Sequence, residues 1–125
     1  RPTTTTKTTR GNIELAASVS SQYVSSVLIS APYARSPVTL TLTGTVVSEP
    51  FIDMTVALMQ QFGVAVTKSA PNVFHIPNTG YTNPEHYEIE ADASSASYPL
   101  AIAAVTGGTV TVQGVGNASI QVRLL

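Results

Sequence analysis

The chain contains no cysteine, no tryptophan and only two histidines, and only 10% of its residues are charged. The absence of cysteine excludes disulfides, thiolate nucleophiles and cysteine metal sites. His75 and His86 are not spaced as a His-x-x-x-His pair and cannot form a metal centre alone. The six basic residues are scattered and balanced by seven acidic ones, so we expect no nucleic-acid partner.

Long apolar runs are also missing, because proline, glycine or charged residues interrupt each candidate. With a polar start to the sequence, this predicts neither a signal peptide nor a membrane span. We therefore expect a cytoplasmic location and no membrane partner. A chain of 125 residues forms one small domain or part of a larger one.

The first residues carry almost no side chain that could be buried. The sequence reads Arg-Pro-Thr-Thr-Thr-Thr-Lys-Thr-Thr-Arg over residues 1–10. Segments of this composition cannot bury enough apolar surface to offset the entropy of ordering. Residues 1–11 are therefore predicted to be a disordered, threonine-rich tail.

From Asn12 onward, apolar periodicity predicts alternating strands and helices. Pro32 ends the first helix, Ser48-Glu49-Pro50 is typical of a helix start, and Gly63 is suited to the end of that helix. The predicted order is a strand over 12–17, a helix over 23–31, a strand over 38–42, a helix over 48–62, and short strands over 64–67 and 73–76.

A second, shorter series follows, with a strand over 87–91, a helix over 93–105 capped by Asp92, and a strand over 109–113. Pro99 lies inside this helix, which conflicts with a regular helix. Three dipeptides recur in order at offsets of 72 to 76 residues, Ile13-Glu14 matching Ile89-Glu90 among them. Internal duplication explains this, although two unrelated units of common composition remain an alternative. We predict an α/β fold with one complete βαβαββ unit and the start (βαβ) of a second, as a fragment of a longer repeat-built protein.

Ser20, Ser21 and Gln22 lie where a strand leads into a helix N-terminus. Hydroxyls, an amide and unpaired backbone N–H groups at such a point can hold a phosphate without a basic residue. An ordinary N-cap is the alternative, and Ser48 has the same two interpretations. The sequence contains no nucleophile elbow, Walker loop or dinucleotide fingerprint. Asp53, Asp92 and both histidines are interpreted as structural, capping or exposed residues, so no catalytic residue or metal site is predicted.

Four segments carry a resemblance to a known family. They are Ser20-Ser21-Gln22-Tyr23-Val24-Ser25-Ser26-Val27-Leu28, Ala31-Pro32-Tyr33-Ala34, Ser48-Glu49-Pro50-Phe51-Ile52-Asp53-Met54-Thr55 and Asp92-Ala93-Ser94-Ser95-Ala96-Ser97-Tyr98-Pro99-Leu100-Ala101. The chain resembles 5-enolpyruvylshikimate-3-phosphate (EPSP) synthase, in the form found within the fungal pentafunctional arom polypeptide. The resemblance covers residues 12–121, whereas residues 122–125 match nothing in the family.

The resemblance implies a transferase that moves the enolpyruvyl group of phosphoenolpyruvate onto shikimate 3-phosphate, in chorismate and aromatic amino acid biosynthesis, without metal or cofactor. It implies that Ser20, Ser21 and Ser48 contact the shikimate phosphate. It places Gln22 beside the shikimate ring and phosphoenolpyruvate. Phe51 replaces the family's usual tyrosine and is a weaker candidate.

The family's basic clamp and its catalytic aspartate, lysine and glutamate lie outside this segment. The chain alone is therefore expected to carry part of a substrate site and to be inactive, with the remaining segments of the same polypeptide as its partners. The alternative is a non-catalytic remnant or an interaction module that binds no substrate.

Overall fold

The computed structural model describes residues 7–9, 11–116 and 119. The chain forms two compact units, residues 1–85 and 86–125. The elements are β1 (Lys7–Thr9), β2 (Asn12–Ala16), α1 (Ser21–Ser30), the short 3-10 helix η1 (Ala31–Tyr33), β3 (Val38–Thr43), α2 (Glu49–Gln61), β4 (Thr67–Ala70), β5 (Val73–Ile76) and α3 (Ser97–Thr106).

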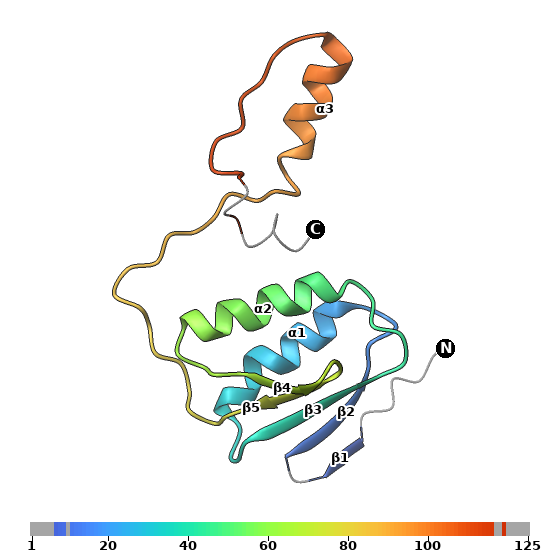
Figure 1. The fold of residues 1–125 in the computed structure, drawn as a ribbon, viewed down its shortest axis with the longest axis vertical. Helices are drawn as coiled ribbons and strands as arrows, with labels where there is room; N and C mark the ends of the chain where they lie inside the picture. The colour runs from blue at the N-terminus through green and yellow to red at the C-terminus, as the bar shows by residue number, and fades with distance from the viewer. Residues whose placement is uncertain (1–6, 10, 117–118, 120–125) are drawn as a thin grey trace. The chain divides into compact units, whose positions relative to one another are not determined.

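The first unit is a mixed sheet with both of its α-helices on one face (Figure 1). Its strands lie in the order β1-β2-β3-β5-β4. β2 and β3 run parallel and are joined by α1, as a crossover connection requires. β5 pairs antiparallel with both β3 and β4. The segment from β2 to β5 is therefore the complete βαβαββ unit that the sequence predicts.

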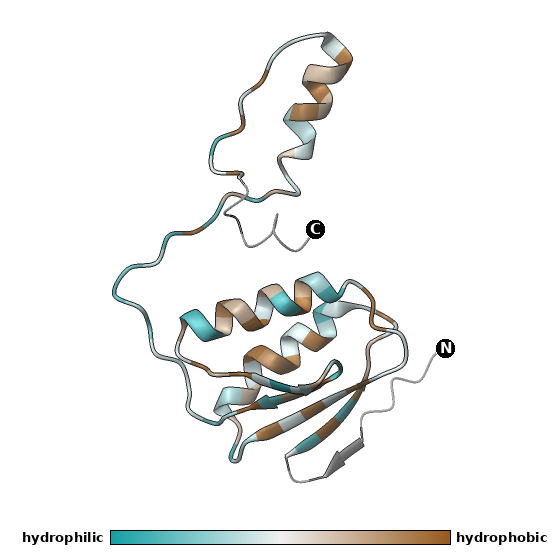
Figure 2. Ribbon diagram, in the orientation of Figure 1, coloured by the Kyte–Doolittle hydropathy of each residue, from teal (hydrophilic) through white to brown (hydrophobic). Residues whose placement is uncertain are grey.

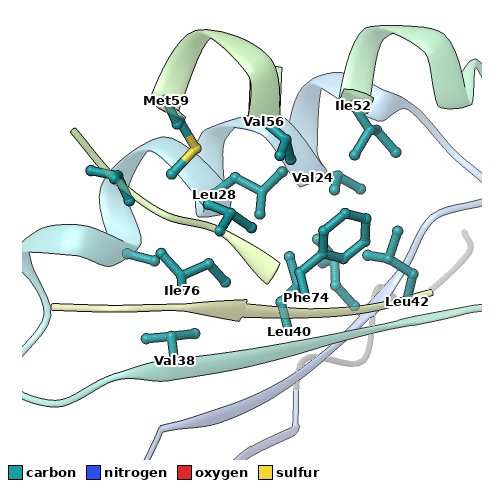
Figure 3. Packing of buried hydrophobic residues seen from close by; sticks show 14 of the residues in the cluster. Val24, Leu28, Val38, Leu40, Leu42, Ile52, Val56, Met59, Phe74 and Ile76 are labelled. Atoms are coloured by element: carbon teal, nitrogen blue, oxygen red, sulfur yellow. The ribbon is translucent and has the colours of Figure 1, made fainter. Parts of the chain in front are cut away.

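Strict alternation in β3 determines which sheet face is buried. Val38, Leu40 and Leu42 are buried, and the threonines between them point to the other side. Figure 2 shows the same alternation of apolar and polar residues along the strands. Side chains from α1, α2, β3 and β5 close the core between helices and sheet (Figure 3). The largest of its fully buried residues are Phe74, Leu28, Leu40, Ile52, Met59 and Ile76.

The opposite face of the sheet is polar and carries His75. Its Nδ1 lies 3.1 Å from Thr39 Oγ1 and its Nε2 lies 2.8 Å from Ser69 Oγ. Both ring nitrogens are therefore occupied by neighbouring hydroxyls on adjacent strands. This agrees with the interpretation of His75 as an exposed structural residue.

Most boundaries in the first unit lie within two residues of the predictions, and two differences are larger. Lys7–Thr9 pair antiparallel with β2, so the predicted disordered tail is wrong for these three residues, because threonine fits a pleated strand well. Residues 1–6 and 10 lie outside the described residues. β4 begins at Thr67 rather than at Val64. Val64 and Val66 are buried like strand residues, but the pairing with β5 starts only after them.

The second unit contains α3, four residues shorter at its start than predicted. Asp92 does not cap α3, whose N-cap is Ala96. Instead its carboxylate accepts hydrogen bonds from the Ser94 backbone at 2.9 Å and from the Ser95 hydroxyl at 2.6 Å. Both bonds lower the pKa of Asp92, and the bond from the Ser95 hydroxyl has the larger effect. Pro99 is accommodated as the third helical residue, where its missing N–H would have no partner within the helix.

The two strands predicted on either side of α3 are not formed in the described residues: 87–91 and 109–113 have no strand structure. A strand needs a neighbouring ladder for its backbone groups, and a lone pair of strands is only marginally stable. Of the predicted start (βαβ) of a second βαβαββ unit, only the helix, α3, is therefore formed in the described residues.

The four residues 122–125 lie outside the described part of the chain. No helix in the described residues is both long and apolar enough to cross a membrane.

Candidate functional site

A pocket of about 530 Å³ lies between α1 and α2 in the first unit. Both helices begin at the same end of the unit (Figure 1), so the positive ends of two helix dipoles face this region. Every residue that the sequence analysis proposed as a ligand lines it. The full lining is Ser20, Ser21, Gln22, Ser25, Ser26, Ile29, Ser48, Phe51, Met54 and Thr55.

The α1 side of the pocket is a capped helix N-terminus. Ser20 is the N-cap, in an extended conformation, and its Oγ accepts a hydrogen bond of 3.2 Å from the Gln22 backbone N–H. This confirms the capping interpretation. It also leaves the hydroxyl hydrogen of Ser20 available to a ligand, because a hydroxyl has one donor and two acceptor positions. Ser21 is buried beside it and Gln22 is exposed.

The α2 side begins at Ser48, which is the only non-glycine residue with a positive φ among the described residues (φ 56°, ψ 48°). Its side chain makes no capping hydrogen bond, so the predicted hydroxyl cap is wrong. The left-handed backbone turns the residue away from the extended geometry that capping serine normally adopts. A side chain in this region is strained, and such strain is concentrated at functional sites.

Replacing Ser48 with glycine is expected to raise the free energy of unfolding by about 0.5 to 1 kcal/mol. Glycine relieves the left-handed strain, and no capping bond is lost; part of the gain is offset by the greater freedom of glycine in the unfolded chain. Ser48→Ala keeps the strain and should change stability very little. Urea unfolding of both variants would measure this, and a clear loss in Ser48→Ala would mean that the hydroxyl does cap α2.

Phe51 lies one turn into α2 and is 47% exposed, so the ring borders the pocket and is not part of the core. None of the pocket-lining residues is charged. Glu49, between Ser48 and Phe51 in sequence, adds a carboxylate to the first turn of α2. An anion in this pocket would therefore be held by hydroxyls, an amide and helix N-termini, without a basic side chain from its lining.

Five of the lining residues were not proposed as ligands from the sequence, and two of them, Ser25 and Thr55, contact each other. Their hydroxyl oxygens lie 2.8 Å apart and connect the two helices. Each lies four residues after a candidate, Ser21 or Phe51, and residues four apart share a helix face. The spacing could therefore have predicted that Ser25 and Thr55 line the pocket, although it does not predict that their two hydroxyls contact each other.

The far end of the α1 wall is held by a tyrosine from the loop after β5. Tyr81 donates a hydrogen bond of 2.8 Å from its hydroxyl to the backbone oxygen of Ile29, a pocket residue. Partial burial, and secondarily Tyr33, raises the pKa of Tyr81 above its ordinary value. The phenol therefore stays protonated and remains a donor at neutral pH.

Comparisons with known proteins agree on one family. The family model for EPSP synthase (3-phosphoshikimate 1-carboxyvinyltransferase) matches residues 2–125. Pentafunctional AROM polypeptides of Malassezia globosa, Schizosaccharomyces pombe and Yarrowia lipolytica are 62%, 61% and 59% identical to the chain over 112, 114 and 114 residues. Each alignment covers 89% of this chain, which spans 7% of the length of each relative.

Proposed function

Because the chain belongs to the EPSP synthase family, we propose that the pocket between α1 and α2 is part of a shikimate 3-phosphate site in aromatic amino acid biosynthesis. The proposal rests on one observation: candidate residues that are distant in the sequence come together in one pocket. Ser20, Ser21, Gln22 and Ser48 are separated by up to 28 positions (48 − 20 = 28) in the sequence and line one pocket.

In this proposal the phosphate group lies against the two helix N-termini. The Ser20 hydroxyl is free to donate, since its oxygen already accepts from Gln22. Ser21 and Ser48 supply two further hydroxyls, and hydrogen bonds to a charged oxygen are stronger than neutral ones. The Gln22 side chain offers both a donor and an acceptor, which suits the ring hydroxyls and the neighbouring phosphoenolpyruvate.

The same lining argues against complete catalysis by this chain. Two phosphorylated substrates, one of which also carries a carboxylate next to the reacting atoms, require concentrated positive charge, and the pocket lining has none. The basic and proton-transferring groups would come from other segments of the longer polypeptide. We propose that the chain contributes ligand residues to the enolpyruvyl transfer and no catalytic ones.

The test is a titration of the isotope-labelled chain with shikimate 3-phosphate, followed by amide chemical shifts. Changes should centre on Ser20–Gln22 and on Ser48–Phe51, with none along β4. Shikimate without phosphate serves as the matched ligand control and should shift these amides much less. A separate assay should show no phosphate release from phosphoenolpyruvate and shikimate 3-phosphate above a protein-free control.

A second candidate is a non-catalytic interaction module. It is favoured by α3, where Leu100, Ile102 and Val105 are exposed although apolar, because large exposed apolar patches often mark interaction surfaces. The titration separates the two candidates. Absence of any shift at Ser20–Gln22 would support the interaction module, whereas phosphate release by the chain alone would contradict the non-catalytic role.

A further inference from the structure

A pair of hydroxyl groups, on Ser25 and Thr55, links α1 to α2 within the lining of the candidate pocket. Thr55 Oγ1 donates to the Phe51 backbone oxygen at 2.8 Å, and it also lies 2.8 Å from Ser25 Oγ. Thr55 is 8% exposed. A polar group at such a position is normally hydrogen-bonded, and this one bonds both its own helix and the neighbouring helix.

The direction of each hydrogen bond follows from the number of protons. A threonine hydroxyl carries one hydrogen, and that of Thr55 is directed to the Phe51 carbonyl. Ser25 must therefore be the donor in the bond between the two hydroxyls, with Thr55 Oγ1 as the acceptor. The interhelical contact has one defined polarity, which fixes the side-chain conformations of both residues.

The hydrogen bond between Ser25 and Thr55 restricts the relative position of α1 and α2 in a way that the apolar core does not. The other buried contacts between α1 and α2 involve apolar residues such as Val24, Ile52 and Val56, and apolar burial is non-directional. A hydrogen bond has preferred lengths and angles. The Ser25 and Thr55 pair therefore restricts how far one helix can slide or rotate against the other.

We propose that Thr55 is a positioning residue, which through Ser25 holds the α1 ligand residues at a fixed distance from Ser48 on α2. Ser21 lies one turn before Ser25, and Phe51 lies one turn before Thr55. The pair is thus a polar link between the two helices one turn beyond these residues, within the lining of the same pocket. The consequence for ligand affinity depends on the proposed function above, whereas the effect on helix placement does not.

The test compares Thr55→Val, which removes the hydroxyl at similar size, with Thr55→Ser, which keeps it. In the free protein, Thr55→Val should shift the amide resonances of Ser20–Gln22, and Thr55→Ser should leave them near their original positions. In calorimetry with shikimate 3-phosphate, Thr55→Val should raise Kd by about tenfold and Thr55→Ser by less than about twofold. Thr67→Val, on the exposed strand β4, is the matched control and should change neither measurement.

Ser25→Ala breaks the same bond from the other helix and serves if Thr55→Val folds poorly. It should reproduce the resonance shifts of Ser20–Gln22. If the free-state resonances of Ser20–Gln22 are unchanged in a folded variant of either kind, the positioning role is overturned, whatever the ligand does. If those resonances move while the original chain binds no shikimate 3-phosphate, the positioning role stands and the proposed function fails.

Discussion

Replacing Phe74 with alanine is expected to lower the free energy of unfolding of the first unit by about 3 to 5 kcal/mol. Phe74 is 2% exposed and extends from β5 into the core under the helices (Figure 3). Alanine would remove most of this buried surface and leave a cavity that the neighbouring side chains fill only in part. Small domains have total stabilities of about 5 to 15 kcal/mol, so a large fraction would be lost.

Urea unfolding followed by far-ultraviolet circular dichroism would measure the effect. Phe51→Ala is the matched control, because the same side chain is removed from a half-exposed position on α2. It should cost less than half as much as Phe74→Ala. Equal losses at the two positions would contradict the assignment of Phe74 to the core and of Phe51 to the pocket edge.

The second large effect concerns the ligand. Replacing Ser20 and Ser21 together with alanine is expected to raise the Kd for shikimate 3-phosphate by about a hundredfold or more, since each hydrogen bond to a charged oxygen contributes about 1.5 to 3 kcal/mol. Calorimetry on the original chain and the double variant would measure it. Ser30→Ala, at the far end of α1, is the serine control and should leave Kd unchanged.

Capping and ligand binding must be separated at Ser20, because its oxygen accepts from the Gln22 amide. Alanine removes the cap and costs about 1 kcal/mol of stability, whereas glycine at an N-cap costs only a few tenths. Ser20→Gly combined with Ser21→Ala should therefore retain most of the stability and still lose the affinity. If the affinity of this variant for shikimate 3-phosphate is unchanged, both serines have a purely structural role.

The first unit could be predicted from the sequence because its apolar residues recur with a regular period over whole elements. The residues that start or end its helices are also easy to recognise. Val38, Leu40 and Leu42 alternate with threonines, and Gly63 adopts the positive φ (81°) that a helix end of this kind requires. Pairing could not be predicted in the same way. That β5 lies beside β3, and that β4 starts at Thr67, depends on contacts between distant segments, which local patterns do not encode.

The candidate site, like the fold, could be predicted only in part from the sequence. Ser20 was predictable both as a cap and as a candidate ligand, because its place between strand and helix is readable in the sequence. Ser48 looked like a similar cap, yet its left-handed backbone is imposed by the loop that brings the chain from β3 to α2. The meeting of Ser25 with Thr55 requires knowledge of how two helices pack. In the second unit, residues 87–91 have a strand-like pattern but form no strand, because a strand also requires backbone ladder pairing, which a local pattern does not specify.

The position of β5 inside the sheet also determines when a growing chain can complete its core. β2, α1 and β3 form a contiguous segment, and they can associate as soon as they leave the ribosome. Phe74 and Ile76, which close the core beside β3, are synthesised only after α2 and β4. Until then the nascent chain exposes the free edge of β3 and the apolar side chains of Leu28 and Leu40, a state in which unpaired edges and uncovered apolar surface favour aggregation. The interval between the synthesis of β3 and that of β5 is therefore a stage at which the nascent unit is exposed to aggregation.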